Sequence, residues 1–289
     1  MCDTAELKDE KLTISNYVVV NGAQSLSTFK KNKTHLSENL RVLAKIVQLN
    51  DANLSRKITV NSNNQNAIKP RDLKATNDIQ LRLREEFKGI LDGRYELEIK
   101  RGQPQSDGTV LISNEEAGRL LLAFDLMEPE ACHQVYKLFD DKYAEIFARP
   151  AVSAYRVIFL HLLMEKVRES VIKIDYKPLS KYGLTRFFLM SVVSQLIQAD
   201  NYGRDVFKDP AKLFTSNEIN KFCKAIGEIL DTIIVDLNYE VVELGESFDY
   251  KGDFKSSVKL RDLRAKLLRS FEKDVARNKA EPLSAIMVD

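Results

Sequence analysis

The sequence predicts a mixed α/β (α+β) unit with a small mixed sheet over residues 1–110, followed by a mainly α-helical domain over residues 111–289. Three observations predict this fold class. Short segments of the N-terminal part alternate apolar and polar residues, as strands do. A turn-rich segment over residues 101–108 interrupts that pattern. Beyond it, apolar residues recur at helical spacing.

Three strands are expected in the N-terminal unit. The first covers Leu12–Val20 and ends in a β-branched run, the second lies within Leu40–Val47, and the third covers Arg94–Lys100. In the third, apolar and charged residues alternate, which predicts one buried face. Helices are expected over Ala23–Lys31 and Ala75–Phe87, and their order between the strands indicates a small layered unit.

The C-terminal domain should begin with a capped helix. Ser113 precedes two glutamates and an apolar run, which is typical of a helix start. Pro129 is expected as the first residue of a helix that continues to Phe147. The other predicted helices are Ala151–Val171, Gly183–Gln198, Asn217–Val235 and Ser257–Arg277.

The last predicted helix is basic beside its apolar stripe. The first interpretation is a solvated face next to a packed one, and the alternative is a surface that faces phosphates or a partner. The basic residues of this segment are Lys255, Lys259, Arg261, Arg264, Lys266, Arg269 and Lys273.

Composition excludes several classes of protein. The 44 basic and 42 acidic residues nearly cancel, so any nucleic-acid contact must come from local patches. The three cysteines are far apart and odd in number, which argues against a disulfide framework and favours a reducing cytoplasm. Cys132 and His133 are adjacent and cannot easily share a metal on a helix, so neither a metal nor another cofactor is expected. No apolar run is long enough to span a membrane.

The first amide-rich motif contains Asn21, Gly22, Gln24 and Ser25 at the junction of a predicted strand and helix. Such a junction exposes free backbone N–H groups and the positive end of the helix dipole, which together can bind an anion. The alternative is structural: Asn21 and Gly22 form a turn, and the following hydroxyl residues lie on the helix surface.

The second motif contains Asn63, Gln65 and Asn66, and the basic residues Lys69 and Arg71 follow it. Amides can pair with base edges while basic groups contact phosphates. Two structural alternatives remain open: a polar loop that starts the next helix, or a buried network in which the two motifs satisfy each other.

Catalytic patterns are weak throughout the chain. There is no nucleophile elbow and no paired-histidine metal motif. Glu96, Glu98 and Lys100 have the spacing found at the end of a metal-dependent nuclease motif, but the necessary acidic residue on a neighbouring strand is not evident. A nuclease function for this chain is therefore a remote alternative.

The two motifs, together with the charged strand that ends at Lys100-Arg101-Gly102, resemble the abortive phage infection family called AIPR. Members typically have a Val-Asn-Gly-x-Gln-Thr motif, a strand, an Asn-x-Gln-Asn-x-Ile segment, a helix and a strand ending in Lys-Arg-Gly. The resemblance is specific over residues 17–102 and weaker through Phe147. Ser25 replaces the threonine; the matching residues are Asn21, Gly22, Gln24, Asn63, Gln65, Asn66 and Ile68.

The resemblance implies a bacterial antiphage-defence protein. Members usually carry a nuclease-like region before the first motif, and this chain begins almost at that motif, so it is expected to be a C-terminal portion or a shortened relative. It should then bind nucleic acid or another phosphate-bearing ligand, or dock a nuclease domain or a second subunit. The expected ligand-binding residues are Asn21, Gly22, Gln24, Ser25, Asn63, Gln65, Asn66, Lys69, Arg71 and Arg101.

Overall fold

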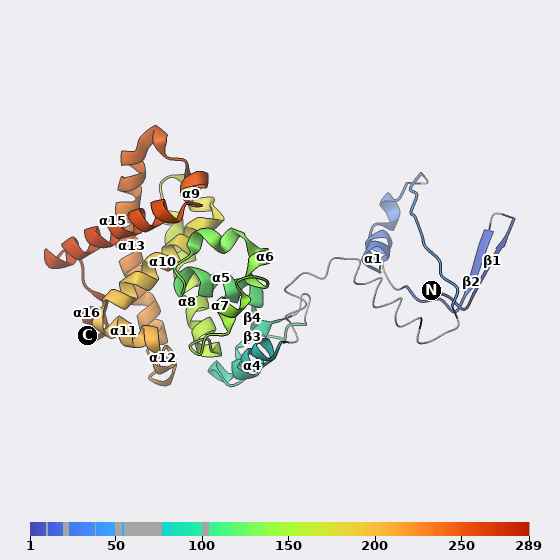
Figure 1. Ribbon diagram of the computed structural model, residues 1–289, viewed down its shortest axis with the longest axis horizontal. Coiled ribbons are helices and arrows are strands. Elements are labelled where there is room, and N and C mark those ends of the chain that lie inside the picture. The colour runs from blue at the N-terminus through green and yellow to red at the C-terminus, as the bar shows by residue number, and fades with distance from the viewer. Residues whose placement is uncertain are drawn as a thin grey trace. The chain divides into compact units, whose positions relative to one another are not determined.

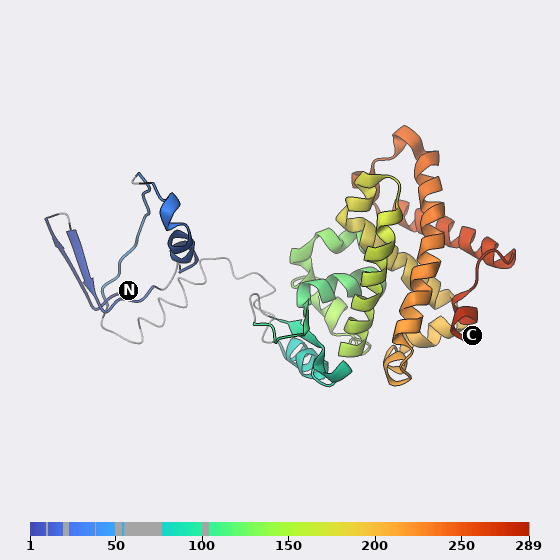
Figure 2. The same ribbon diagram turned by 180° about the vertical axis from the view of Figure 1, so that it is seen from behind.

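The structure is a computed structural model, and it describes residues 1–9, 11–19, 23–37, 39–49, 54, 77–99 and 104–288. Contacts divide the chain into two compact units, Met1–Ile68 and Lys69–Asp289. Figures 1 and 2 show the elements of both units from opposite sides. The domain limits expected from the sequence, on either side of residue 110, stay a prediction.

The N-terminal unit contains an antiparallel hairpin and one helix. Strands β1 (Thr4–Lys8) and β2 (Lys11–Ser15) pair with Thr4 opposite Ser15. Helix α1 (Ala23–Lys31) has the predicted bounds and is followed by a 3-10 turn, η1 (Lys33–His35). The expected inward position of Leu26 is wrong, because this side chain is 51% exposed.

Two strands predicted for this unit differ from those observed. The first ends at Ser15, where Asn16 takes a left-handed backbone conformation (φ 47°) that breaks the regular ladder. The second, Leu40–Val47, forms no ladder, and the only bridge in this region joins Cys2 to Gln48 among the described residues. Its apolar side chains suit a strand, but pairing depends on a neighbour that local sequence does not reveal.

A small parallel sheet opens the second unit. Strand β3 (Tyr95–Glu98) pairs in parallel with β4 (Val110–Ser113), which the sequence did not predict. The predicted buried face of β3 is confirmed, because Tyr95, Leu97 and Ile99 are all buried. Helix α4 (Asp78–Phe87) packs against this strand, and a 3-10 turn, η2 (Leu91–Gly93), connects them.

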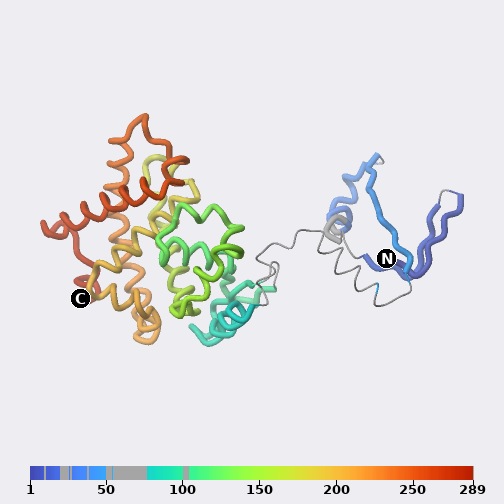
Figure 3. Tube along the Cα trace, in the orientation of Figure 1, coloured from blue at the N-terminus to red at the C-terminus, as the bar shows by residue number. Residues whose placement is uncertain are grey.

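Helix α5 (Asn114–Phe124) begins as predicted, since the Ser113 side chain accepts a hydrogen bond from the Glu116 backbone N–H at 3.0 Å. The single helix expected from Pro129 to Phe147 is wrong. The chain instead forms η3 (Pro129–His133), α6 (Val135–Leu138) and α7 (Tyr143–Phe147), traced in green in Figure 3.

Packing against α5 accounts for this broken segment. Phe139, Tyr143 and Phe147 pack against one another with ring centroids 5.1–6.4 Å apart. Phe147 also lies against Gly118, where an added Cβ would be 3.1 Å from the phenylalanine ring. Burying three rings in this way stabilises the segment more than one continuous solvated helix would.

The remaining predicted helices are confirmed, with shifted ends. The largest difference is at α13, which continues well beyond the expected Val235. The elements are α8 (Ala154–Ser170), η4 (Val171–Lys173), α9 (Lys177–Lys181), α10 (Gly183–Ala199), α11 (Asn201–Lys208), α12 (Ala211–Thr215), α13 (Ile219–Leu244), η5 (Gly245–Ser247), α14 (Tyr250–Asp253), α15 (Ser257–Ala276) and α16 (Leu283–Val288).

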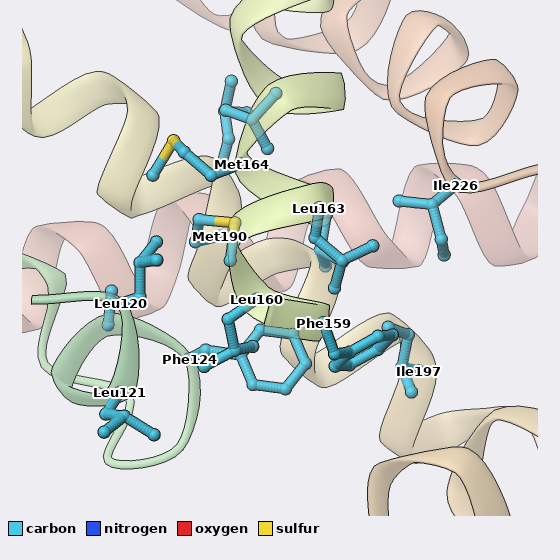
Figure 4. Close-up of a cluster of buried hydrophobic side chains, with 14 of the residues drawn as sticks. Leu120, Leu121, Phe124, Phe159, Leu160, Leu163, Met164, Met190, Ile197 and Ile226 are labelled. Atoms are coloured by element: carbon cyan, nitrogen blue, oxygen red, sulfur yellow. The ribbon is translucent and has the colours of Figure 1, made fainter. Parts of the chain in front are cut away.

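Helix α8 lies at the centre of the second unit. It packs against α5, α10 and α13, and it carries buried apolar residues on all its faces. Figure 4 shows this core, where Phe124 of α5, Phe159 and Leu163 of α8 and Ile197 of α10 gather. The predicted fold class is thus confirmed: small two-stranded sheets precede a mainly helical C-terminal part.

Candidate functional site

Most of the predicted ligand-binding residues lie outside the described part of the chain. Gln24 and Ser25 occupy the first turn of α1, where the structure describes the backbone alone. The placement of the others is not described: Asn21, Gly22, Asn63, Gln65, Asn66, Lys69, Arg71 and Arg101.

The chain segments that precede the two motifs both pair with residues 1–2. The Met1 amine donates to the Val18 carbonyl oxygen at 2.8 Å, and the Val18 N–H donates to the Met1 carbonyl oxygen at 2.8 Å. The Cys2 N–H donates to the Val47 carbonyl oxygen, and the Leu49 N–H donates to the Cys2 carbonyl oxygen, both at 3.0 Å. Both segments are therefore anchored to one short stretch of backbone, in which Cys2 is buried.

The first motif leads directly into the N-terminus of α1. The first turn of this helix contains no acidic residue, and its basic residues, Lys30 and Lys31, lie in the last turn. Backbone N–H groups in a first helical turn have no partner within the helix, and the dipole makes this end positive. The segment after Asn21 and Gly22 can therefore attract an anion.

The described residues of this unit form almost no core. Cys2 alone is buried among them, whereas many large apolar side chains are exposed. Exposed apolar side chains gathered in one small unit favour contact with another surface. They are Leu7, Leu12, Tyr17, Val18, Val19, Leu26, Leu36, Leu40, Val42, Leu43, Ile46 and Leu54.

A polar pocket of ≈ 410 Å³ lies in the helical unit, between the N-terminal ends of α5 and α10 and the side of α8. Its lining combines charged and apolar groups. The lining residues are Ser113, Glu115, Glu116, Arg119, Leu120, Met164, Arg168, Gly183, Arg186 and Phe187.

One carboxylate in this pocket binds two side chains of α8. Glu116 Oε1 lies 3.2 Å from His161 Nδ1 and 3.1 Å from Arg168 Nη2. Burial alone would raise the pKa of Glu116, but the hydrogen bond to His161 and the positive charge of Arg168 outweigh burial and hold the pKa below the usual 4.5. Glu116 therefore stays ionised at neutral pH.

Acid should remove the stabilisation that this carboxylate provides. Because the folded-state pKa is lowered, the contribution is complete above the unfolded pKa of 4.5 and disappears as the pH falls through the lower folded value. We expect Glu116→Gln to lower the melting temperature most at about pH 6 and least at about pH 3. Thermal unfolding of both proteins across this range tests it, and a pH-independent difference would contradict it.

The sequence does not reveal this pocket. The start of α5 at Ser113 is predictable, but the arginines that line the pocket come from three different helices: Arg119, Arg168 and Arg186. No local spacing connects them, so only the packing of the helices brings them together. Ser113 and the glutamates after it were the one available signal.

The described residues contain no assembled site for a metal ion or for nuclease chemistry. No group of three His, Cys, Asp or Glu residues there is arranged to hold a metal ion. Glu96 and Glu98 are half-buried on β3, and Lys100 lies outside the described residues. The Cys132 thiol donates to the Arg119 carbonyl oxygen at 3.4 Å, and burial raises its pKa well above the usual range.

The basic helix α15 has several of its charges paired within the unit. Lys266 binds Glu240 at 2.8 Å, and Lys259 binds Asp253 at 2.5 Å. Arg264 is buried and donates to Gln195 at 2.8 Å and to Ser191 at 3.1 Å. These three side chains therefore hold the helix in place.

The fold and the motifs together define a class: a mainly helical protein with an N-terminal unit that carries two amide-rich motifs. The chain belongs to the AIPR family, because the family model described as AIPR protein matches residues 1–241. This membership supports a role in abortive infection, a defence against phage. No curated protein and no solved structure matches the chain. In the part that the structure describes, no helix has the length and apolar character needed to cross a membrane.

Proposed function

We propose that this AIPR protein acts in antiphage defence in the cytoplasm as a non-catalytic recognition module that binds nucleic acid or another phosphate-bearing ligand. The observation that carries the proposal is the pairing of Val18, Val47 and Leu49 with residues 1–2. This pairing joins the residues shortly before the first motif and the segment that ends at Leu49, upstream of the second motif, to the same short stretch of backbone. The start of α1 at Ala23 adds free N–H groups directly after the first motif.

Each group of residues has a role in this proposal. The amides of Gln24, Gln65 and their neighbours supply directional hydrogen bonds, which read the shape or the base edges of the ligand. Lys69, Arg71 and Arg101 supply positive charge, which attracts phosphates. Because phosphate contacts release counterions, affinity for nucleic acid should fall steeply with salt.

Binding of labelled single- and double-stranded DNA and RNA to the purified chain tests the proposal. We expect binding at low salt that weakens as salt rises, with an affinity loss in a Gln24→Ala/Gln65→Ala double variant of about tenfold or more. The matched control is Gln134→Ala/Gln198→Ala, which removes two amides from the helical unit and should leave binding unchanged. Absence of binding at low salt, or equal binding by both double variants, would contradict the proposal.

The second candidate is a protein-interaction module that docks a nuclease domain or a second subunit. The exposed apolar side chains of the N-terminal unit favour it, since a partner could cover them. In this case the amide motifs form a structural network, and Gln24→Ala and Gln65→Ala should lower the melting temperature more than they change nucleic-acid binding. Unchanged melting temperatures in both single variants would count against it.

A further inference from the structure

Arginines outnumber carboxylates in the lining of the pocket between α5, α8 and α10. Three arginines and two glutamates line it. Glu116 is already bound by His161 and Arg168, so its charge is compensated within the protein. Arg119 and Arg186 remain as the cations available to a ligand.

Both of these arginines can donate further hydrogen bonds. Arg119 stacks on Phe187, with its guanidinium carbon 4.5 Å from the ring centroid, and its closest carboxylate contact, to Glu115, is 3.9 Å long. Its Nε is buried and has no hydrogen-bond partner. Arg186 forms no ion pair with any residue that the structure describes. Because 3.9 Å is too long for a hydrogen bond, the terminal Nη groups of Arg119 can still donate to a ligand.

The N-terminus of α10 adds to the positive charge in the pocket. This 17-residue helix begins at Gly183 without a side-chain cap and without an acidic residue in its first turn. Gly183 lines the pocket, and an added Cβ there would meet nothing within 4 Å, so a side chain at this position has open space. The helix dipole and the N–H groups of Gly183 and Leu184, which have no partner within the helix, lie in the same turn as Arg186.

The lining also has an apolar part. Phe187 is half-buried at the pocket wall, and Leu120 and Met164 are buried behind it. A volume of ≈ 410 Å³ lies in the range of small-molecule sites, in which an apolar wall holds the ligand and a few polar groups orient it. The arrangement suits a ligand with one charged end and one less polar part.

We infer that this pocket binds a small phosphate-bearing molecule of about nucleotide size. Its phosphate accepts hydrogen bonds from Arg119, Arg186 and the first turn of α10, and its organic part packs on the ring of Phe187, the apolar lining residue that is not fully buried. All of the lining residues of this site belong to the helical unit, and the inference does not depend on the proposed function.

Calorimetry and thermal unfolding of the full chain with pyrophosphate, adenosine diphosphate and adenosine test the inference. We expect both phosphate compounds to bind and raise the melting temperature, with the diphosphate binding more tightly, and adenosine to do neither. If pyrophosphate and adenosine diphosphate bind with equal affinity, the result supports a phosphate site here. It contradicts a contribution of the apolar wall to binding.

Substitutions at Gly183 separate binding from folding. Gly183→Asp places a carboxylate in the open space, where it repels phosphate but favours the helix dipole. We expect affinity for the phosphate compounds to fall by about tenfold or more with no loss of unliganded melting temperature. Gly183→Ala adds the same Cβ without charge and should bind as the parent protein does.

Arginine variants supply the second comparison. Arg186→Gln should weaken binding, whereas Arg204→Gln, an exposed arginine on α11, should not. The inference is overturned if neither phosphate compound binds, or if Gly183→Asp binds as tightly as Gly183→Ala. The Gln24→Ala/Gln65→Ala variant should keep this binding, so a failure here and a failure of the proposed function can be told apart.

Discussion

Replacing Asp125 by asparagine is expected to lower the free energy of unfolding by about 3–5 kcal/mol. Asp125 Oδ1 accepts hydrogen bonds from Arg156 at 2.6 and 3.1 Å, and Oδ2 lies 2.8 Å from Arg149. The side chains of Asp125 and Arg156 are 1% and 2% exposed. The variant keeps the shape of the side chain but leaves Arg156 buried without its counter-charge, and that explains the size of the loss.

Urea unfolding of the parent protein and the variant measures this loss. Glu228→Gln is the matched control, because Glu228 pairs with Lys224 at 3.6 Å on the exposed face of α13 and should contribute little. A stability of Asp125→Asn close to that of the parent protein would show that Arg156 is adequately held by its contacts with Phe124 and Phe207.

The second large effect is expected from Phe159→Ala, which should cost about 3–5 kcal/mol. Phe159 is fully buried on α8, and its ring centroid lies 6.2 Å from that of Phe124 and 5.7 Å from that of Phe222. It therefore joins α5 to α13 through the central helix (Figure 4). Removing the ring leaves a cavity that three helices can close only by moving together.

Equilibrium unfolding also tests this second prediction. Phe159→Leu should recover a large part of the stability, because it restores most of the buried volume. Tyr136→Ala removes an aromatic side chain that is 62% exposed and should change stability by no more than about 0.5 kcal/mol. A small loss in Phe159→Ala would mean that the core collapses into the space.

The predictions from sequence succeeded where the signal is local. The Ser113 cap, the alternation along β3 and the helical spacing of α8, α10 and α15 each depend on residues a few positions apart. They failed where the outcome depends on distant partners. Leu40–Val47 has a strand's composition without a ladder, and the helix expected from Pro129 gives way to ring packing against α5.

The same distinction applies to the sites. The amide-rich motifs are continuous in sequence, so their residues could be named without a structure. Arg119, Arg168 and Arg186 stand far apart along the chain, and each is unremarkable on its own helix. Only the packing of α5, α8 and α10 forms the pocket, which is why no spacing rule could have found it.

The division of the chain into two units has a consequence for genetics. Among the described residues, every buried apolar side chain except Cys2 lies at Leu83 or later. Substitutions in the helical unit should therefore act mainly through the steady-state amount of protein, because a destabilised core increases degradation. If the amide-rich motifs bind the ligand as proposed, substitutions in them should instead leave abundance intact and abolish phage resistance directly. A mutational screen that records protein level beside survival would sort the alleles into these two groups.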